Sequence, residues 1–234
     1  MRIAALAPCA LVFLALSQLT GQGPAAANDW MIVPGVRVGP VNSTTVHDDL
    51  KKLFPGSTVV DQELELDEGM VFPATMVAQN VPGESLAIVW TGKGADARPK
   101  QVFMCRGRRR GICKYHAVFP GGDIATGTKL SELETMNGKP FTIGGFGWTY
   151  GSNVISWDGG KLAAWDCNAT LSIAVDGERN REGGLTMPLT SDERGTFTGN
   201  RPVPTTTQAL RKLNPVITEI LFIFPAAVAK PCSR

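Results

Sequence analysis

Residues 124–140 read Ile-Ala-Thr-Gly-Thr-Lys-Leu-Ser-Glu-Leu-Glu-Thr-Met-Asn-Gly-Lys-Pro, and the rest of the chain can be arranged around them. The stretch combines a short apolar strand, a Gly-Thr helix start, one or two amphipathic turns and an Asn-Gly-Lys-Pro ending. Threonine favours the position before a helix, and glycine followed by proline favours its end. The stretch therefore predicts the start of a domain that opens on a short helix.

A weaker copy of this pattern lies near the N-terminus. Thr45 precedes Thr128 by 83 residues, and the same offset relates Leu50 to Leu133. An ungapped match across the strand, the cap and the apolar helix face indicates an internal repeat. The alternative is a chance likeness between two short amphipathic helices.

After each predicted helix, the apolar residues change to the alternating period of β-strands. The predicted strands are residues 57–66, 70–78, 85–91, 100–106, 111–119, 141–148, 153–157, 161–165, 169–175 and 216–224. Residues 177–201 read as a polar loop, and residues 205–213 as a brief helix. We predict an α+β fold of two tandem units, each a short helical segment packed on an antiparallel β-sheet, at residues 28–120 and 121–234.

The first 27 residues have the features of a cleavable signal peptide. Arg2 provides a positive charge, residues 3–19 are almost wholly apolar, and residues 25–27 are three alanines. We predict cleavage after Ala27, which gives a periplasmic or secreted protein without an integral membrane span. An uncleaved anchor, which needs about 20 apolar residues, is the alternative.

The cysteines agree with export to an oxidising compartment. Without Cys9, an even set of four remains: Cys105, Cys113, Cys167 and Cys232. Cys105 and Cys113 flank a turn in one predicted hairpin, so we pair them and join Cys167 to Cys232 by elimination. Four cysteines allow three pairings, and four free thiols are the alternative.

The composition gives no general case for nucleic acid or an anionic membrane as partner. The chain has 234 residues, 43% hydrophobic and 19% charged, with a formal net charge of +2. This is ordinary globular composition with little net charge to attract a polyanion. With two histidines, His47 and His116, we predict no metal site, and we predict no cofactor.

The sharpest charge cluster is a set of four arginines between two cysteines: Arg106, Arg108, Arg109 and Arg110. Guanidinium groups present forked donors that suit phosphates and carboxylates. Clamped by a disulfide, this basic loop is predicted to dock on lipid headgroups, lipopolysaccharide or an acidic protein patch. A solvated hairpin tip is the alternative.

A second candidate is the aromatic cluster formed by Trp148, Tyr150, Trp157 and Trp165. Aromatic strands can form a platform for sugars or peptides, and packing in the core is the alternative. We include Trp148, Tyr150 and Trp157 among the predicted binding residues.

No catalytic residue is predicted. His47 lies beside two aspartates at a helix start, where a solvated position is expected, and His116 lies in a predicted strand. Glu63 and Glu65 share one strand face and are expected to face water. The motifs Gly-x-Ser-x-Gly, Ser-x-x-Lys and His-Glu-x-x-His do not occur. Residues 144–147 are followed by a strand pattern instead of the helix a phosphate loop needs, so we expect their glycines to lie opposite aromatic rings.

The pattern Gly127-x5-Leu133-x4-Gly138-x-Pro140 resembles the Gly-x5-[Val/Leu]-x4-Gly-x-Pro signature of BamE-like outer-membrane assembly lipoproteins. It is also similar to the repeat units of β-lactamase-inhibitor-like proteins. The resemblance implies a short helical segment across a small antiparallel sheet, with two units in tandem in the inhibitors. The layout further resembles uncharacterised secreted bacterial proteins with a Gly-Phe-x-Trp-x-Tyr-Gly segment, here residues 145–151.

The first unit departs from this signature, and the lipidated cysteine of BamE-like proteins is missing after the signal peptide. We therefore predict an exported, non-enzymatic protein that binds a protein or an envelope component through sheet faces and the basic loop. An inhibitor or recognition module for a secreted enzyme is the alternative, and an envelope hydrolase is the third class.

Overall fold

The computed structural model describes residues 28–66, 69–78, 80–105, 113–119, 122–148, 151–164, 171–176 and 189–224. Within these residues the fold is α+β, as predicted, and its secondary structure consists mostly of strands in three sheets, with a few short helices. The signal peptide lies outside the described residues, as do Cys167, Cys232, Tyr150, Trp165 and the arginines of the basic loop.

The strands are β1 (Met31–Val33), β2 (Arg37–Val38), β3 (Val41–Asn42), β4 (Val59–Glu65), β5 (Val71–Val77), β6 (Leu86–Trp90), β7 (Pro99–Met104), β8 (His116–Phe119), β9 (Gly122–Ala125), β10 (Thr142–Gly144), β11 (Val154–Ser156), β12 (Leu171–Asp176), β13 (Pro202–Pro204) and β14 (Val216–Ile223). The helices are α1 (Leu50–Leu53), α2 (Leu130–Asn137), α3 (Ser191–Gly195) and α4 (Gln208–Leu213), with the 3-10 helices η1 (His47–Asp49) and η3 (Lys161–Ala164).

The largest sheet is antiparallel and has the order β12-β14-β7-β6-β5-β4. A five-stranded sheet has the order β3-β2-β1-β8-β9 and contains one parallel pair, β1 with β8. The third sheet is β11-β10-β13. Each of the two larger sheets takes strands from both sides of the predicted boundary at residue 120, so the two halves of the chain are interlocked.

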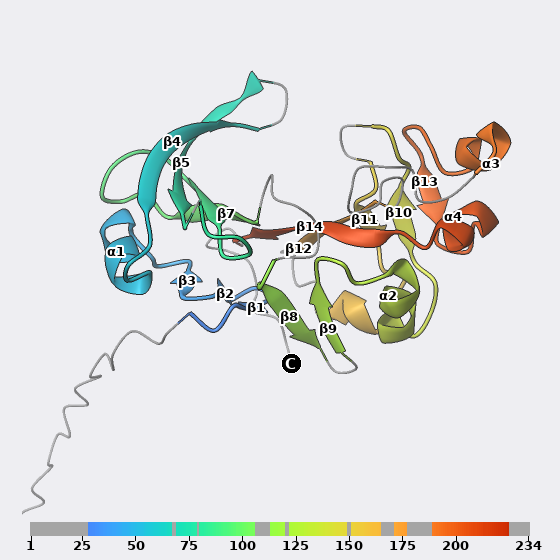
Figure 1. Ribbon diagram of the computed structural model, residues 1–234, viewed down its shortest axis with the longest axis horizontal. Coiled ribbons are helices and arrows are strands. Elements are labelled where there is room, and N and C mark those ends of the chain that lie inside the picture. The colour runs from blue at the N-terminus through green and yellow to red at the C-terminus, as the bar shows by residue number, and fades with distance from the viewer. Residues whose placement is uncertain are drawn as a thin grey trace, which may run out of the picture.

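Two apolar clusters cover the two faces of the six-stranded sheet. Ile88, Val102 and Phe222 point into the main core, whereas their strand neighbours Ala87 and Phe103 belong to a smaller cluster. Figure 1 shows β14 crossing the centre of the molecule, with α1 beside β4 and β5 at one end and α2, α3 and α4 near β10 and β13 at the other. Because both faces are apolar, the central strands are buried where β7 meets β14.

The two helix starts share the same side-chain hydrogen bonds at the offset of 83 residues. The hydroxyl of Thr45 accepts from the backbone N–H of Asn42 at 3.0 Å, and that of Thr128 accepts from Ala125 at 3.1 Å. One residue further on, the carboxylate of Asp49 accepts from the backbone N–H of Val46 at 3.1 Å. The carboxylate of Glu132 accepts from the N–H of Lys129 in the same way, at 2.9 Å. The bonds to Thr45 and Thr128 hold the end of the strand that leads into each helix, and the bonds to the carboxylates satisfy N–H groups at the helix start that have no partner within the helix.

Helix α2 ends on a buried side chain that joins it to the next part of the chain. Asn137 is 1% exposed, and its Nδ2 donates to the carbonyl oxygens of Lys139 and Trp157, each at 3.0 Å. Its Oδ1 accepts from the N–H of Leu162 at 3.1 Å. Gly138 follows with φ 77° and closes the helix by donating to the carbonyl of Glu134.

Residues 161–164 form the 3-10 helix η3, so the strand predicted for residues 161–165 is wrong over that range. The Asp-Gly-Gly turn is present, with positive φ at Asp158 (52°) and Gly159 (71°), but it leads into η3 instead of a returning strand. Gly160 lies so close to Asn137 that a Cβ atom there would overlap its amide. The tertiary contact with Asn137 therefore overrides the hairpin pattern.

Among the glycines of residues 144–147, which were expected to lie opposite aromatic rings, Gly145 has a different role, and Gly151 shares it. A Cβ atom on Gly145 would meet backbone carbonyl oxygens of residues 197, 199 and 201, and one on Gly151 would meet the carbonyl of Gly145. These two glycines permit close contact between backbones, not contact with aromatic rings. The stretch predicted as a polar loop also contains α3, which Thr190 caps by accepting from Glu193 N–H at 3.2 Å.

Replacing Asn137 by alanine should destabilise the protein by about 2–4 kcal/mol, because the carbonyls of Lys139 and Trp157 and the N–H of Leu162 each lose a hydrogen bond. The free energy of unfolding in urea measures this loss. Asn200→Ala, at an exposed position, should change it by less than about 0.5 kcal/mol. Equal stability of Asn137→Ala and Asn200→Ala would contradict the anchoring role of Asn137.

Candidate functional site

The base of the predicted basic loop is fixed to the sheet by covalent and hydrogen bonds. Cys105 and Cys113 form a disulfide with a Cα–Cα distance of 5.7 Å, which confirms the predicted pairing. The backbone N–H of Cys105 donates to Ser85 and that of Lys114 donates to Gly83, at 2.8 and 2.9 Å. Closing a loop of sequence separation 8 stabilises the fold by about 2.5 kcal/mol in the chain-entropy model.

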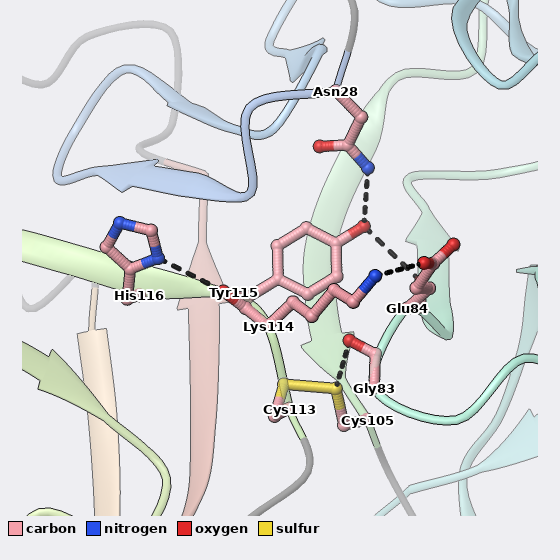
Figure 2. Close-up of a disulfide and its surroundings, with 8 residues drawn as sticks. All are labelled: Asn28, Gly83, Glu84, Cys105, Cys113, Lys114, Tyr115 and His116. Atoms are coloured by element: carbon pink, nitrogen blue, oxygen red, sulfur yellow. Dashed lines mark hydrogen bonds and ion pairs between the residues drawn. A yellow bond between two sulfur atoms is a disulfide. The ribbon is translucent and has the colours of Figure 1, made fainter.

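Tyr115 lies next to this disulfide, as Figure 2 shows, and is fully buried. Its hydroxyl accepts from Asn28 at 3.1 Å and donates to the carbonyl of Glu84 at 3.4 Å. Burial raises the pKa of this phenol, so it stays neutral at physiological pH. Lys114 pairs with the Glu84 carboxylate at 2.6 Å. The loop therefore starts from a rigid base, but its arginines lie outside the described residues and their binding role stays a prediction.

The two described tryptophans of the predicted aromatic cluster differ in environment. Trp148 is 56% exposed, whereas Trp157 is 7% exposed and packs on Phe141 with a ring-centroid distance of 4.9 Å. Trp157 thus contributes to the core beside Asn137. Trp148 is the one of the pair that presents its ring to solvent.

A pocket of about 630 Å³ lies at the β4 edge of the six-stranded sheet. It is bounded by η1, the strands β4 and β5, the end of β6, and the turn between β6 and β7. We call it the edge pocket, and the side chains that define its chemistry are His47, Asp61, Glu63, Thr75, Trp90 and Lys93.

Local structure places each of these side chains. The backbone N–H of Val46 donates to the carboxylate of Asp49, and this bond fixes the helix start that directs His47 over the sheet. Asp61 and Glu63 alternate along β4 and so point to one face. The register of the β4–β5 hairpin sets Thr75 directly opposite Asp61.

A chain of hydrogen bonds runs from the floor of the edge pocket to its rim. The indole Nε1–H of Trp90 donates to the hydroxyl of Thr75 at 2.9 Å, and this hydroxyl donates to Oδ1 of Asp61 at 2.7 Å. Nε2 of His47 lies 2.8 Å from the same oxygen, so an imidazole protonated on Nε2 donates to it. Trp90 and Thr75 are buried, while His47 and Asp61 are open to solvent.

This chain keeps Asp61 ionised. The pKa of its carboxyl is lowered, first because Thr75 donates to it and also because of His47, while partial burial acts in the opposite direction. Two further carboxylates belong to the rim. Asp48 lies 3.6 Å from Nδ1 of His47, and Glu63 pairs with Lys93 at 3.1 Å.

The arrangement offers charged and hydrogen-bonding groups above a buried floor. Among the described residues that line the pocket, Thr75 has a side-chain hydroxyl. This hydroxyl is buried and already donates a hydrogen bond to Asp61. Within the described part of the chain, no group of three or more His, Cys, Asp or Glu side chains is placed to hold a metal ion. What remains is an apolar floor beneath charged, oriented side chains, which is typical of binding sites.

Sequence reasoning did not find the edge pocket. His47 and Glu63 were expected in water, and the structure does leave them partly exposed, but it also joins His47 to Asp61. For Thr75 and Trp90 the sequence predicts a place in a strand and no further role. The alternation of Asp61, Glu63 and Glu65 along β4 was the one local signal of a charged face beside a helix.

Comparisons with protein-family models, with curated proteins and with solved structures found no match.

Replacing Thr75 by valine should raise the pKa of Asp61 toward its ordinary value of about 3.9, because the carboxylate loses its hydroxyl donor. Trp90 would lose its acceptor, which costs about 1–3 kcal/mol. A lowered folded-state pKa stabilises the fold above the unfolded pKa, and this contribution is lost as pH falls through the folded value. The advantage of the parent over the variant should therefore shrink in acid.

Carboxyl-carbon NMR titration measures this pKa directly. Asp158 serves as an internal control, since its pKa is lowered by hydrogen bonds from Ser156 and Thr142 outside the edge pocket. An unchanged Asp61 titration in Thr75→Val, with Asp158 also unchanged, would show that the hydrogen-bond chain does not set the charge of Asp61.

Proposed function

We propose that the protein is an exported, non-enzymatic binding protein that recognises a protein or an envelope component at the edge pocket. The observation that carries this proposal is the hydrogen-bond chain from Trp90 through Thr75 to Asp61 and His47. Side chains held in place before a ligand arrives lose less conformational entropy on binding. The pocket is therefore built as a recognition site.

The charges of the rim support a binding role as well. His47, Asp61, Glu63 and Lys93 keep much of their surface in solvent, so a large partner can reach them without first opening the fold. The basic loop would provide a second contact of opposite charge at the far end of β7. Two contacts of opposite sign favour one orientation of a partner over others.

Export is supported by a covalent bond of the fold. The Cys105–Cys113 disulfide is of a kind that persists in oxidising compartments. In the described residues, no helix is long and apolar enough to cross a membrane. Cleavage after Ala27 and a periplasmic or extracellular location complete the proposal.

The same proposal includes two tandem helix-plus-sheet units, like those implied by the resemblance to BamE-like and β-lactamase-inhibitor-like proteins. The matched hydrogen bonds at Thr45 and Thr128 support it. So does the order of elements, because β4 follows α1 as β10 follows α2. An isolated bridge between Asn153, the residue before β11, and Ala174 then connects the start of β11 to β12. Such units carry binding surfaces on rigid sheets.

Site-specific photo-crosslinking tests the proposed function in the producing cells. A benzoylphenylalanine residue at position 48 or 93, on opposite sides of the edge pocket, should give the same covalent adduct, identified by mass spectrometry. The side chain of Asp48 is fully exposed, so the replacement leaves the core intact. Adducts with one secreted enzyme would identify the inhibitor class.

Position 123 is the matched control, since Asp123 is an exposed acidic residue on β9 outside the edge pocket. It should give no such adduct. Identical adducts at positions 48, 93 and 123, or none at 48 and 93, would refute recognition at the edge pocket.

A further inference from the structure

The edge pocket is dominated by negative charge at its rim. Within the described lining, Asp48, Asp61 and Glu63 contribute three carboxylates, against the single ammonium of Lys93. His47 is the other titratable group that faces Asp61. An anionic ligand would meet repulsion from three sides, so charge complementarity favours a cation.

One carboxylate has capacity that the protein does not use. Both protein hydrogen bonds to Asp61 go to Oδ1, and among the described residues none donates to Oδ2. A carboxylate oxygen can accept two hydrogen bonds. The free oxygen of a fixed, ionised group is thus available to a ligand donor.

Glu63 is also available at small cost. Its ion pair with Lys93 is solvent-exposed on both sides, at 63% and 77%. Exposed pairs of this kind are weak, so a ligand can displace Lys93 readily. Because Asp61 and Glu63 alternate along β4, they lie about 7 Å apart at their Cα atoms and point the same way.

Two such carboxylates suit a planar group with several donors. A guanidinium has five N–H donors in a fixed fork, whereas an ammonium is a compact point charge. The methylene stem of an arginine would lie against Val46, Ala95 and Ala97, which also line the pocket. Sugar stacking is disfavoured because the indole of Trp90 is 4% exposed and offers no open face.

We infer that the edge pocket binds the guanidinium of an arginine side chain carried by a partner polypeptide, with Asp61 and Glu63 as its acceptors. This inference rests on the proposed function and names the group recognised. The side chains of Asp61 and Glu63 are 66% and 63% exposed, so the pocket encloses only the end of a side chain. The rest of the ligand stays outside the pocket, and we therefore assign the guanidinium to an arginine of a polypeptide.

Titration of the full mature chain with blocked single residues tests this assignment. The probes are the N-acetyl, N-methylamide derivatives of arginine, lysine and glutamate, followed by NMR of the Trp90 indole N–H and the Gly92 and Gly94 amides. We expect the arginine probe to shift these signals, the lysine probe to bind more weakly, and the glutamate probe to give no shift. Binding should weaken with added salt.

Variants at the two acceptors and at Lys93 should change this affinity in opposite directions. Asp61→Asn and Glu63→Gln should each weaken the arginine probe by about tenfold or more, because each removes a charged hydrogen bond. Lys93→Met should strengthen it by about threefold, because it removes the competing ammonium. Asp158→Asn, an exposed carboxylate outside the edge pocket, should leave it unchanged.

Glu63→Gln keeps the test valid if Asp61→Asn fails to fold, since Glu63 is exposed and its described ion pair is with the exposed Lys93. Equal binding of the lysine probe, no binding of the arginine probe, or insensitivity to Glu63→Gln would overturn the inference. Adducts at positions 48 and 93 alongside any of these results would leave the proposed function standing and remove only the arginine assignment.

Discussion

The pairing of β7 with β14 is the constraint on which the rest of the structure depends. It sets Phe103 opposite Leu221 and Val102 opposite Phe222, and so joins segments almost 120 residues apart in the sequence. Without it, the six-stranded sheet would separate into a four-stranded meander, β4 to β7, and a two-stranded ribbon of β12 and β14. A two-stranded ribbon is marginal in water, whereas a wider sheet with apolar faces is stable.

The edge pocket depends on this sheet indirectly. Strands β5 and β6 are buried between neighbours on both sides, which fixes Thr75 and Trp90 in position. The outer strand β4 then brings its carboxylates to a floor of buried, hydrogen-bonded side chains. Helix η1 closes the site from one side, and its own capping hydrogen bonds determine where His47 lies. A charged rim on a rigid floor is what selective recognition requires.

The features that follow from local sequence were predictable, and those that depend on distant contacts were not. Alternation of apolar residues gave most strands, and a turn between two cysteines gave the Cys105–Cys113 bridge. The segment after Gly160 became a 3-10 helix because Asn137 reaches it across the fold. The pocket was missed for the same reason, since Trp90 meets Asp61 through Thr75 only once the strand registers are set.

The proposed recognition site is complete before any partner binds. Hydrogen exchange of the Trp90 indole N–H in the ligand-free, nitrogen-15-labelled protein tests that claim most directly. If the hydrogen-bond chain exists in solution, this proton exchanges much more slowly than that of the exposed Trp148. Exchange of Trp90 at the rate of Trp148 would contradict the account, because the floor of the edge pocket would then be open in the free protein.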